Sequence, residues 1–206
     1  LPLFHVGGLC IQTLPALAIG ARVSLLPRFE PGAWFDTVEQ WKPSTSLLVP
    51  AVMQALIAHP RWASADLSSL RFVNSGSQIV PRALIEAFHA RGLPVAQVYG
   101  ATETGPVSIA LHPSEARGHV GMAGRPAPGV QVRLAPDGEI LLKAPNLMRG
   151  YHRSADRGFD DEGWFRTGDL AVQHADGFIE VVGRSKELII SGGENIHPAE
   201  IEQWVA

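Results

Sequence analysis

The loop at residues 99–105 gathers the side chains with the clearest capacity for chemistry. It reads Tyr-Gly-Ala-Thr-Glu-Thr-Gly and combines an aromatic ring, glycines, two hydroxyls and a carboxylate. The Tyr99 ring offers a face on which a base can stack, and Thr102 and Thr104 can donate hydrogen bonds to phosphate oxygens. Glu103 offers hard oxygen ligands that suit Mg²⁺ beside phosphates. This combination favours a nucleotide site, and the alternative is a turn whose threonine hydroxyls cap the next segment.

Two other loops contain residues that could complete such a site. Asn74-Ser75-Gly76-Ser77-Gln78 is a polar loop whose backbone groups could line a nucleotide, although this pattern alone is more often a simple turn. Residues 163–170 hold Asp169 directly after Thr-Gly, where its carboxylate could accept both hydroxyls of a ribose. The alternative for Asp169 is a buried turn in which the carboxylate caps backbone N–H groups.

A fourth polar segment, at residues 183–195, has the composition of a hinge followed by a loop. Arg184 and Lys186 stand next to an expected chain boundary, and Gly192 and Gly193 follow in a Gly-Gly turn. The alternative is a solvated surface turn, which is a common environment for arginine and lysine.

The elements that position the first two loops alternate between apolar runs and amphipathic segments. This alternation predicts an α/β fold with a parallel sheet flanked by helices. Ligands bind such sheets outside the carboxyl ends of the strands, which is where both loops stand. The expected strands are 22–26, 46–49, 71–73 and 95–98, and the expected helices are 32–41, 50–57 and 81–88.

The pattern changes near Pro113 to short β-like runs separated by turns. The turns Pro136-Asp137-Gly138 and Ala175-Asp176-Gly177 favour hairpins. We expect a small antiparallel sheet or barrel, with strands at 130–134, 139–143, 170–173 and 178–182. After it, Pro198 opens a helix. The expected domains are an α/β part at 1–115, a β-barrel-like part at 116–184, and at 185–206 the hinge and the start of a small C-terminal α+β domain.

Composition narrows the classes of function. Lys and Arg number 17 against 20 Asp and Glu, a net charge of −3, which excludes an electrostatically driven nucleic-acid binder. The single cysteine, Cys10, excludes an internal disulfide and favours a reducing, cytoplasmic setting. The apolar stretches are too short to span a bilayer. A dinucleotide-dependent dehydrogenase is disfavoured, because no Gly-x-Gly-x-x-Gly follows the first strand.

In their order along the chain, these motifs resemble the adenylate-forming superfamily of acyl- and aryl-CoA synthetases, peptide-synthetase adenylation domains and luciferases. The resemblance covers essentially the whole sequence. It rests on residues 2–8 (Phe-His-x-x-Gly), 99–105 (Tyr-Gly-x-Thr-Glu), 138–151 (Gly-Glu-Ile to Gly-Tyr), 164–170 (Trp-x-x-Thr-Gly-Asp-Leu) and 183–202 (a junction leading to Pro-x-Glu-Ile-Glu).

The resemblance implies an ATP-dependent, AMP-forming acid–thiol ligase. A carboxylate would attack the α-phosphate of ATP to give an acyl-adenylate and pyrophosphate, and a thiol, usually that of coenzyme A, would then displace AMP. The implied ligands are ATP, Mg²⁺, coenzyme A and a small carboxylic acid, either fatty or aromatic. Residues 191–202 look most like those of bacterial acyl- or aryl-CoA ligases.

The resemblance also implies roles for the residues of the nucleotide site. Tyr99 would stack on adenine, with the Gly76-Ser77-Gln78 backbone along the edge of the base. Thr102 would touch the α-phosphate and Glu103 would hold Mg²⁺. Asp169 would bind the ribose hydroxyls.

The remaining implied roles concern the acyl pocket and the hinge. His5 and the Gly100-Ala101 backbone would border the acyl pocket, and Arg184 would assist in binding the ribose. Lys186 would be the hinge about which the family's small C-terminal domain rotates. The Gly192-Gly193 loop would approach the site for thioester formation.

Two lysine-bearing features of the family have no counterpart in the sequence. These are the Gly/Ser/Thr-rich phosphate loop and a lysine near the end of the C-terminal domain. We therefore expect an internal fragment of an acyl-CoA synthetase that does not adenylate acids by itself. Two alternatives stay open: a non-catalytic nucleotide-binding or interaction module of the same fold, and an adenylation domain that does not use coenzyme A.

Overall fold

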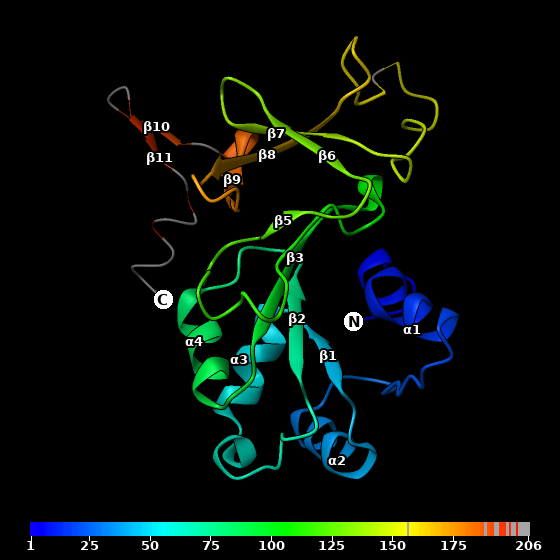
Figure 1. The fold of residues 1–206 in the computed structure, drawn as a ribbon, viewed down its shortest axis with the longest axis vertical. Coiled ribbons are helices and arrows are strands. Elements are labelled where there is room, and N and C mark those ends of the chain that lie inside the picture. The colour runs from blue at the N-terminus through cyan, green and yellow to red at the C-terminus, as the bar shows by residue number, and fades with distance from the viewer. Residues whose placement is uncertain (156, 188, 192–193, 197, 199–200, 202–206) are drawn as a thin grey trace. The chain divides into compact units, whose positions relative to one another are not determined.

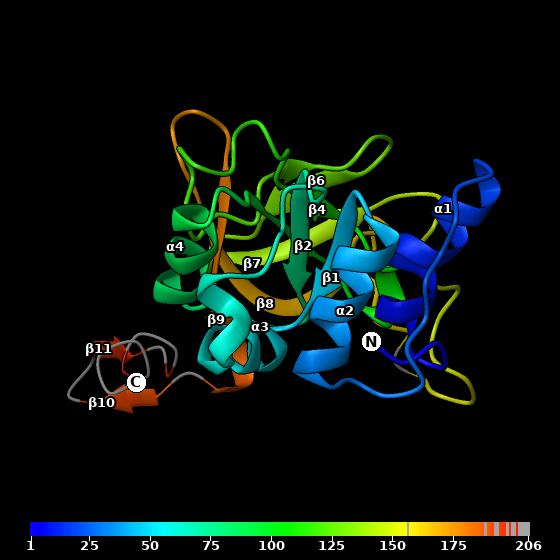
Figure 2. The ribbon, with the colours of Figure 1, turned by 90° about the horizontal axis from the view of Figure 1, so that it is seen from below.

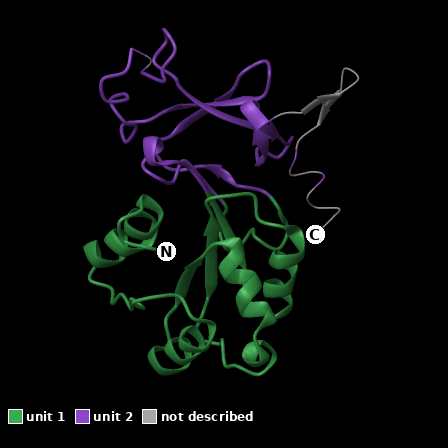
Figure 3. Cartoon of the chain, turned by 180° about the vertical axis from the view of Figure 1, so that it is seen from behind, with its two compact units in different colours: residues 1–98, 111–121 green, residues 99–110, 122–206 purple. Residues whose placement is uncertain are grey.

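The structure is a computed structural model (Figure 1) that describes residues 1–206 except 156, 188, 192–193, 197, 199–200 and 202–206. The chain divides into two compact units (Figure 3). Unit 1 comprises residues 1–98 and 111–121, and unit 2 comprises residues 99–110 and 122–206. The domain boundaries expected after residues 115 and 184 stay predictions.

Unit 1 is built around three parallel strands. They are β1 (Thr45–Leu48), β2 (Phe72–Gly76) and β3 (Val95–Tyr99), of which the last residue, Tyr99, opens unit 2. β2 pairs with both neighbours, and Val73 stands opposite Ser46 on one side and Val95 on the other. The strands expected at 46–49, 71–73 and 95–98 are therefore confirmed.

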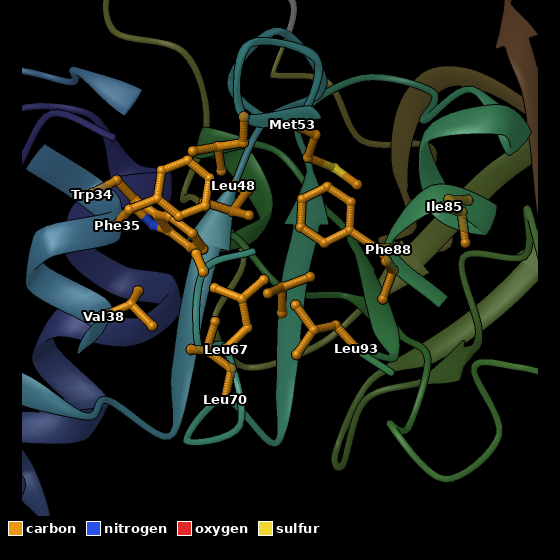
Figure 4. Close-up of a cluster of buried hydrophobic side chains, with 14 of the residues drawn as sticks. Trp34, Phe35, Val38, Leu48, Met53, Leu67, Leu70, Ile85, Phe88 and Leu93 are labelled. Atoms are coloured by element: carbon orange, nitrogen blue, oxygen red, sulfur yellow. The ribbon is translucent and has the colours of Figure 1, made fainter. Parts of the chain in front are cut away.

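Three helices cover one face of these strands. They are α2 (Pro31–Trp41), α3 (Pro50–Ala58) and α4 (Arg82–Ala90), which confirm the three expected helices. α2 and α3 each begin with a proline, whose fixed φ suits the first turn, where no N–H is needed. Figure 4 shows part of the core that they share with the strands, including Trp34, Phe35, Val38, Met53, Ile85 and Phe88 from the helices and Leu48 from β1. Val73 and Val95, of β2 and β3, belong to the same core.

The opposite face of β1 and β2 carries an N-terminal helical segment that the sequence did not indicate. A π-helical turn, η1 (Gly7–Thr13), runs into α1 (Leu14–Ala18). The Gln12 side chain donates to Thr45 Oγ1 (3.1 Å) and to Asn74 Oδ1 (2.7 Å). Successive strand residues point to opposite faces, so Thr45 and Asn74 face away from the core of α2 to α4. In Figures 1 and 2, α1 accordingly lies on the other side of β1 from α3 and α4.

The prediction of a strand at 22–26 is wrong. Residues 21–26 form no strand, and most of their side chains are exposed, including Val23 and Leu25. A strand is stable only with a neighbour whose backbone it can pair with. A run of apolar residues does not reveal whether the fold supplies that neighbour.

Unit 2 contains a four-stranded antiparallel sheet in the order of its sequence. The strands are β6 (Gln131–Leu134), β7 (Glu139–Lys143), β8 (Phe165–Gln173) and β9 (Ile179–Arg184). Both expected Asp-Gly turns join neighbouring strands, which confirms the hairpins and the small antiparallel sheet. A shorter antiparallel pair, β4 (Ile109–Ala110) and β5 (Arg125–Pro126), adds Ile109 to the core of this unit.

Short elements complete both units. They are the 3₁₀ turns η2 (Pro60–Ala63), η3 (Thr102–Thr104) and η4 (Ser185–Glu187), and the antiparallel strands β10 (Ile189–Ser191) and β11 (Glu194–Ile196). The helix expected from Pro198 falls mostly outside the described residues; positions 198 and 201 are helical. The expected fold class, a helix-flanked parallel sheet followed by a small antiparallel sheet, is confirmed. No helix in the described part of the chain has the length and apolar character needed to cross a membrane.

Candidate functional site

Tyr99 and Asp169 meet in unit 2 although they are far apart in the sequence. Tyr99 is the last residue of β3, and its hydroxyl donates to Asp169 Oδ2 at 2.8 Å. Asp169 lies in β8 directly opposite Arg184 of β9, whose Nε donates to Asp169 Oδ1 at 2.8 Å. The strand pairing itself therefore brings a cation beside the carboxylate, and the tyrosine closes the cluster from the other side.

The protonation states of this cluster follow from its surroundings. Burial, together with the neighbouring Asp169 carboxylate, raises the pKa of Tyr99 far above its ordinary value, so the phenol remains a hydrogen-bond donor. The same carboxylate raises the pKa of Arg184. An ionised carboxylate has about four acceptor positions. Tyr99 and Arg184 use two of them, which leaves capacity for two further donors such as the hydroxyls of a ribose.

An irregularity in β8 presents Asp169. Glu139 pairs with Leu170 and Leu141 pairs with Arg166, so that Ile140 alone stands opposite the three residues 167–169 of β8. Such a bulge re-aims side chains at the point where the ladder is interrupted. Among the described residues, the donors to both carboxylate oxygens are the side chains of Tyr99 and Arg184, which differs from the expected alternative in which Asp169 caps backbone N–H groups.

The Thr-Gly pair before Asp169 shapes this bulge. The Thr167 hydroxyl donates to the Ile140 carbonyl at 2.8 Å and accepts from the Asp169 N–H at 3.1 Å. Gly168 has a φ of +72°, in the left-handed region that side chains disfavour. The residue types of this motif are therefore those that the local backbone requires.

The loop at 99–105 is folded on itself by Thr104. Its hydroxyl accepts from the Ala101 N–H at 2.8 Å and donates to the Ala101 carbonyl at 3.2 Å, and the residue is buried. The capping alternative thus holds for Thr104, and the expectation that it donates to phosphate is wrong. Thr102 is exposed and Glu103 is half-buried, so both side chains are accessible from solvent.

Glu103 is in turn held by the segment at 146–151. Its carbonyl accepts from the Met148 N–H at 2.8 Å, and its Oε1 accepts from the Tyr151 hydroxyl at 3.2 Å. Asn146 Nδ2 donates to the Thr104 carbonyl at 2.9 Å. Sequence reasoning identified the Gly-Tyr motif at 150–151 but missed this contact, which gives Tyr151 a place at the site.

The predicted adenine loop lies in unit 1, at the carboxyl end of β2. Gly76 is the last residue of the strand, and Ser77 and Gln78 follow it with exposed side chains. Ser77 adopts a φ of +73°, which is uncommon for a residue with a side chain. The buried Ser75 hydroxyl before it has no hydrogen-bond partner in the described part of the chain. The roles assigned to Gly76, Ser77 and Gln78 stay predictions.

The other predicted site residues are placed one by one. His5 is exposed in unit 1, and its Nδ1 accepts from the Gly7 N–H at 3.0 Å, which leaves Nε2 to carry the proton of the neutral ring. Lys186 is exposed on η4. Gly192 and Gly193 lie outside the described residues.

Comparison with known proteins decides the family. A family model described as "AMP-binding enzyme" matches residues 1–152. The chain belongs to the AMP-binding enzyme family. The adenylate-forming resemblance of the motifs is thereby confirmed.

Individual members of the AMP-binding family match almost the whole chain. Indoleacetate–CoA ligase of Aromatoleum aromaticum is 50% identical over 214 residues, which cover 98% of this chain and 42% of that protein. Feruloyl-CoA synthase of an Amycolatopsis species is 42% identical over 98% of this chain and 43% of its own length. The chain thus spans less than half the length of these relatives.

Solved structures of the family have the same fold. The o-succinylbenzoate coenzyme A synthetase of Bacillus subtilis, in complex with ATP and magnesium ion, superposes with a TM-score of 0.88 at 31% identity, over 100% of this chain and 45% of that one. An anthranilate CoA ligase in complex with anthranoyl-AMP has a TM-score of 0.89 at 26% identity, over 98% and 42% of the two chains.

Proposed function

We propose that this chain is part of an ATP-dependent acid–thiol ligase, which adenylates a carboxylic acid and transfers the acyl group to coenzyme A. The observation that carries the proposal is the Tyr99–Asp169–Arg184 cluster, in the same unit as the loop that bears Thr102 and Glu103. The relatives at 50% and 42% identity are named as a CoA ligase and a CoA synthase, which supports the reaction class.

The nucleotide contacts follow from the donors and acceptors of unit 2. The two acceptor positions that remain on Asp169 suit the two hydroxyls of a ribose. Tyr99 lies at the end of β3, and its ring suits stacking on the base. Thr102, exposed in the loop, can donate to a phosphate oxygen.

Adenylation brings two anions together, so the site must offset their repulsion. Mg²⁺ supplies positive charge at the phosphates when it is bound, and it takes one or two protein carboxylates beside them. The Glu103 carboxylate fits this requirement, because it is half-buried, offers hard oxygen atoms and is oriented by the Tyr151 hydroxyl, while Met148 holds the backbone carbonyl of the same residue. The roles of His5, Gly100, Ala101, Lys186, Gly192 and Gly193 are those that the family resemblance implies.

For the acid we propose an aromatic substrate class. The names of the relatives at 50% and 42% identity specify indoleacetate and ferulate, both aromatic acids. A fatty acid is the second candidate. We further propose that residues 1–206 alone do not adenylate acids at a normal rate, since they contain no glycine-rich phosphate loop ending in lysine.

The test uses the intact protein that contains this chain, with ATP, Mg²⁺ and coenzyme A. Aromatic, fatty and short aliphatic acids are compared by pyrophosphate release and by thioester formation. Glu103→Gln should lower pyrophosphate release about a hundredfold or more, whereas Glu86→Gln, on the exposed face of α4, should leave it unchanged.

Three outcomes would contradict parts of this proposal. Pyrophosphate release without thioester would indicate an adenylation domain that does not use coenzyme A. No release with any acid would indicate a non-catalytic module. Robust turnover by residues 1–206 alone would overturn the proposed inactivity of the isolated chain.

A further inference from the structure

A buried carboxylate outside the proposed nucleotide contacts holds the bulge that carries Asp169. Glu139, the first residue of β7, is only 5% exposed. Its Oε1 accepts from the Gly168 N–H at 2.9 Å. Its Oε2 accepts from Arg166 Nε at 2.9 Å and also from the Nη2 of the same guanidinium group.

The bulge creates the need for this carboxylate. Residues 167–169 stand opposite Ile140 alone, so the regular ladder is interrupted here and Gly168 requires another acceptor for its N–H. Oε1 of Glu139 supplies that acceptor. On the other side, the Ser185 hydroxyl of η4 donates to the Gly168 carbonyl at 3.1 Å. Side chains from two different elements therefore hold both polar groups of Gly168.

The charge of Glu139 is balanced in the same contact. A buried carboxylate without a partner is strongly destabilising, and here the guanidinium group of Arg166 binds it with two N–H groups. Arg166 itself is 58% exposed, so its charged group remains hydrated while it pairs with the buried oxygen. In this way a residue of β7 holds the backbone N–H of Gly168 on one side of Thr167 and the side chain of Arg166 on the other.

We propose that Glu139 is a positioning residue for the nucleotide: it holds the Gly168 N–H and the Arg166 guanidinium group so that Asp169 presents its carboxylate to the ribose hydroxyls. Glu139 touches no nucleotide itself and acts through Gly168 and Asp169. The proposal rests on the proposed function, in that Asp169 is taken to bind the ribose.

The test measures binding of ATP and of 2′,3′-dideoxy-ATP to the intact protein by calorimetry, which does not require turnover. Glu139→Gln preserves the size of the side chain, but an amide has a single acceptor oxygen, so it cannot keep both the Oε1 contact with Gly168 and the Oε2 contact with Arg166. We expect the Kd for ATP to rise about tenfold and the Kd for dideoxy-ATP to change less than about twofold. Glu162→Gln is the matched control, because Glu162 also pairs with an arginine, Arg133, but on the surface (68% exposed); both affinities should be unchanged.

Three further variants keep the test decisive. Arg166→Lys retains the charge beside Glu139 but removes the two-point contact. We expect it to raise the Kd for ATP by a smaller factor than Glu139→Gln does, roughly two- to threefold. Asp169→Asn should lose the discrimination between the two nucleotides. The double variant Glu139→Gln/Asp169→Asn should bind ATP no more weakly than Asp169→Asn alone, because one residue acts through the other.

A purely structural role for Glu139 gives different results. Equal weakening of both nucleotides, additive effects in the double variant, or a lower melting temperature with unchanged discrimination would each overturn the proposal. Failure of the proposed function is recognised separately: the wild-type protein would then bind ATP and prefer it over dideoxy-ATP, yet release no pyrophosphate with any acid. Absence of ATP binding by the wild-type protein would overturn both.

Discussion

The Tyr99 hydroxyl and the Asp169 carboxylate are joined by a 2.8 Å hydrogen bond across 70 positions of sequence. The bond links the residue proposed to stack on the base to the residue proposed to bind the ribose. Because Arg184 holds the second oxygen of Asp169, the carboxylate is fixed from two directions. The two nucleotide subsites are therefore coupled before any ligand arrives.

This coupling predicts that Tyr99→Phe weakens nucleotide binding although the ring remains. The variant removes a hydrogen bond to a charged group, which contributes about 1.5–3 kcal/mol. Since Arg184 still orients Asp169, we expect an effect just below this range, about 0.7–1.4 kcal/mol, which is a rise of roughly three- to tenfold in the Kd for ATP. Calorimetry on the intact protein measures this change. Tyr99→Leu, which also removes the ring, should bind more weakly still; wild-type affinity in Tyr99→Phe would show that the hydroxyl plays no part.

Gly100 offers a second prediction, on the backbone of the loop at 99–105. A Cβ at this position would lie 1.9 Å from the Pro106 carbonyl oxygen, which belongs to the backbone and cannot rotate away. Gly100→Ala should therefore lower the melting temperature and reduce pyrophosphate release more than about tenfold, since a misplacement of about 1 Å can cost a hundredfold in rate.

The control for Gly100→Ala is Gly32→Ala. Gly32 lies in the first turn of α2, where the nearest atom to a new Cβ would be His59 Nε2 at 4.0 Å. This change should leave activity intact and stabilise the helix by roughly 0.5–1 kcal/mol. Equal melting temperatures for Gly100→Ala and the wild-type protein would contradict the close approach described above.

Much of the fold could be predicted because its signals are local. The strand at 139–143 and the hairpins at Asp137-Gly138 and Asp176-Gly177 follow from residue types that the local backbone requires. The helices begin at or next to prolines and bury one face, which a period of 3.6 residues reveals. The order of the motifs then predicted the family.

What sequence reasoning missed depends on contacts between distant residues. The run at 22–26 has strand-like residues but no strand forms there. Thr104 and Thr102 look alike in the sequence, yet only the former is buried against its own loop. Glu139 was recognised as part of a motif, but its role at Gly168, 29 positions away, follows from the register of β7 and β8.

Tyr151 gives a third prediction, on the metal requirement. Its hydroxyl donates to Glu103 Oε1 at 3.2 Å, so it orients the carboxylate that we propose for Mg²⁺. Because Tyr151 is 45% exposed, the bond is a modest one, and Tyr151→Phe should raise the Mg²⁺ concentration for half-maximal pyrophosphate release only about two- to threefold. ATP binding without Mg²⁺ should not change. A change in metal-free ATP binding, with an unaltered Mg²⁺ requirement, would contradict this role.

His89 gives a fourth prediction, on the pH dependence of stability. This α4 residue accepts the Val95 N–H through its Nε2 at 3.2 Å, which requires the neutral ring. Burial and, secondarily, the charge of Arg117 lower the pKa of His89 below the ordinary 6.5, against a weaker opposing effect of Glu86. The unfolded chain therefore takes up this proton first as the pH falls. The stability that neutral His89 contributes is fully present above about pH 6.5 and is lost progressively below it, down to the pKa of the folded state.

The experiment follows the His89 ring by NMR and the melting temperature from pH 7.5 to pH 5. The melting temperature should fall as the pH is lowered over this range. In His89→Gln it should fall less, since an amide oxygen can still accept from the Val95 N–H without titrating. His152→Gln, at an exposed histidine, is the control and should follow the wild-type curve. The carboxylate of Asp66, whose pKa is lowered chiefly by its hydrogen bond with Lys42, loses its contribution only as the pH falls below about 4. Its loss therefore does not overlap this range. A His89 ring that titrates at or above 6.5 would show that burial at the α4–β3 contact does not favour the neutral form.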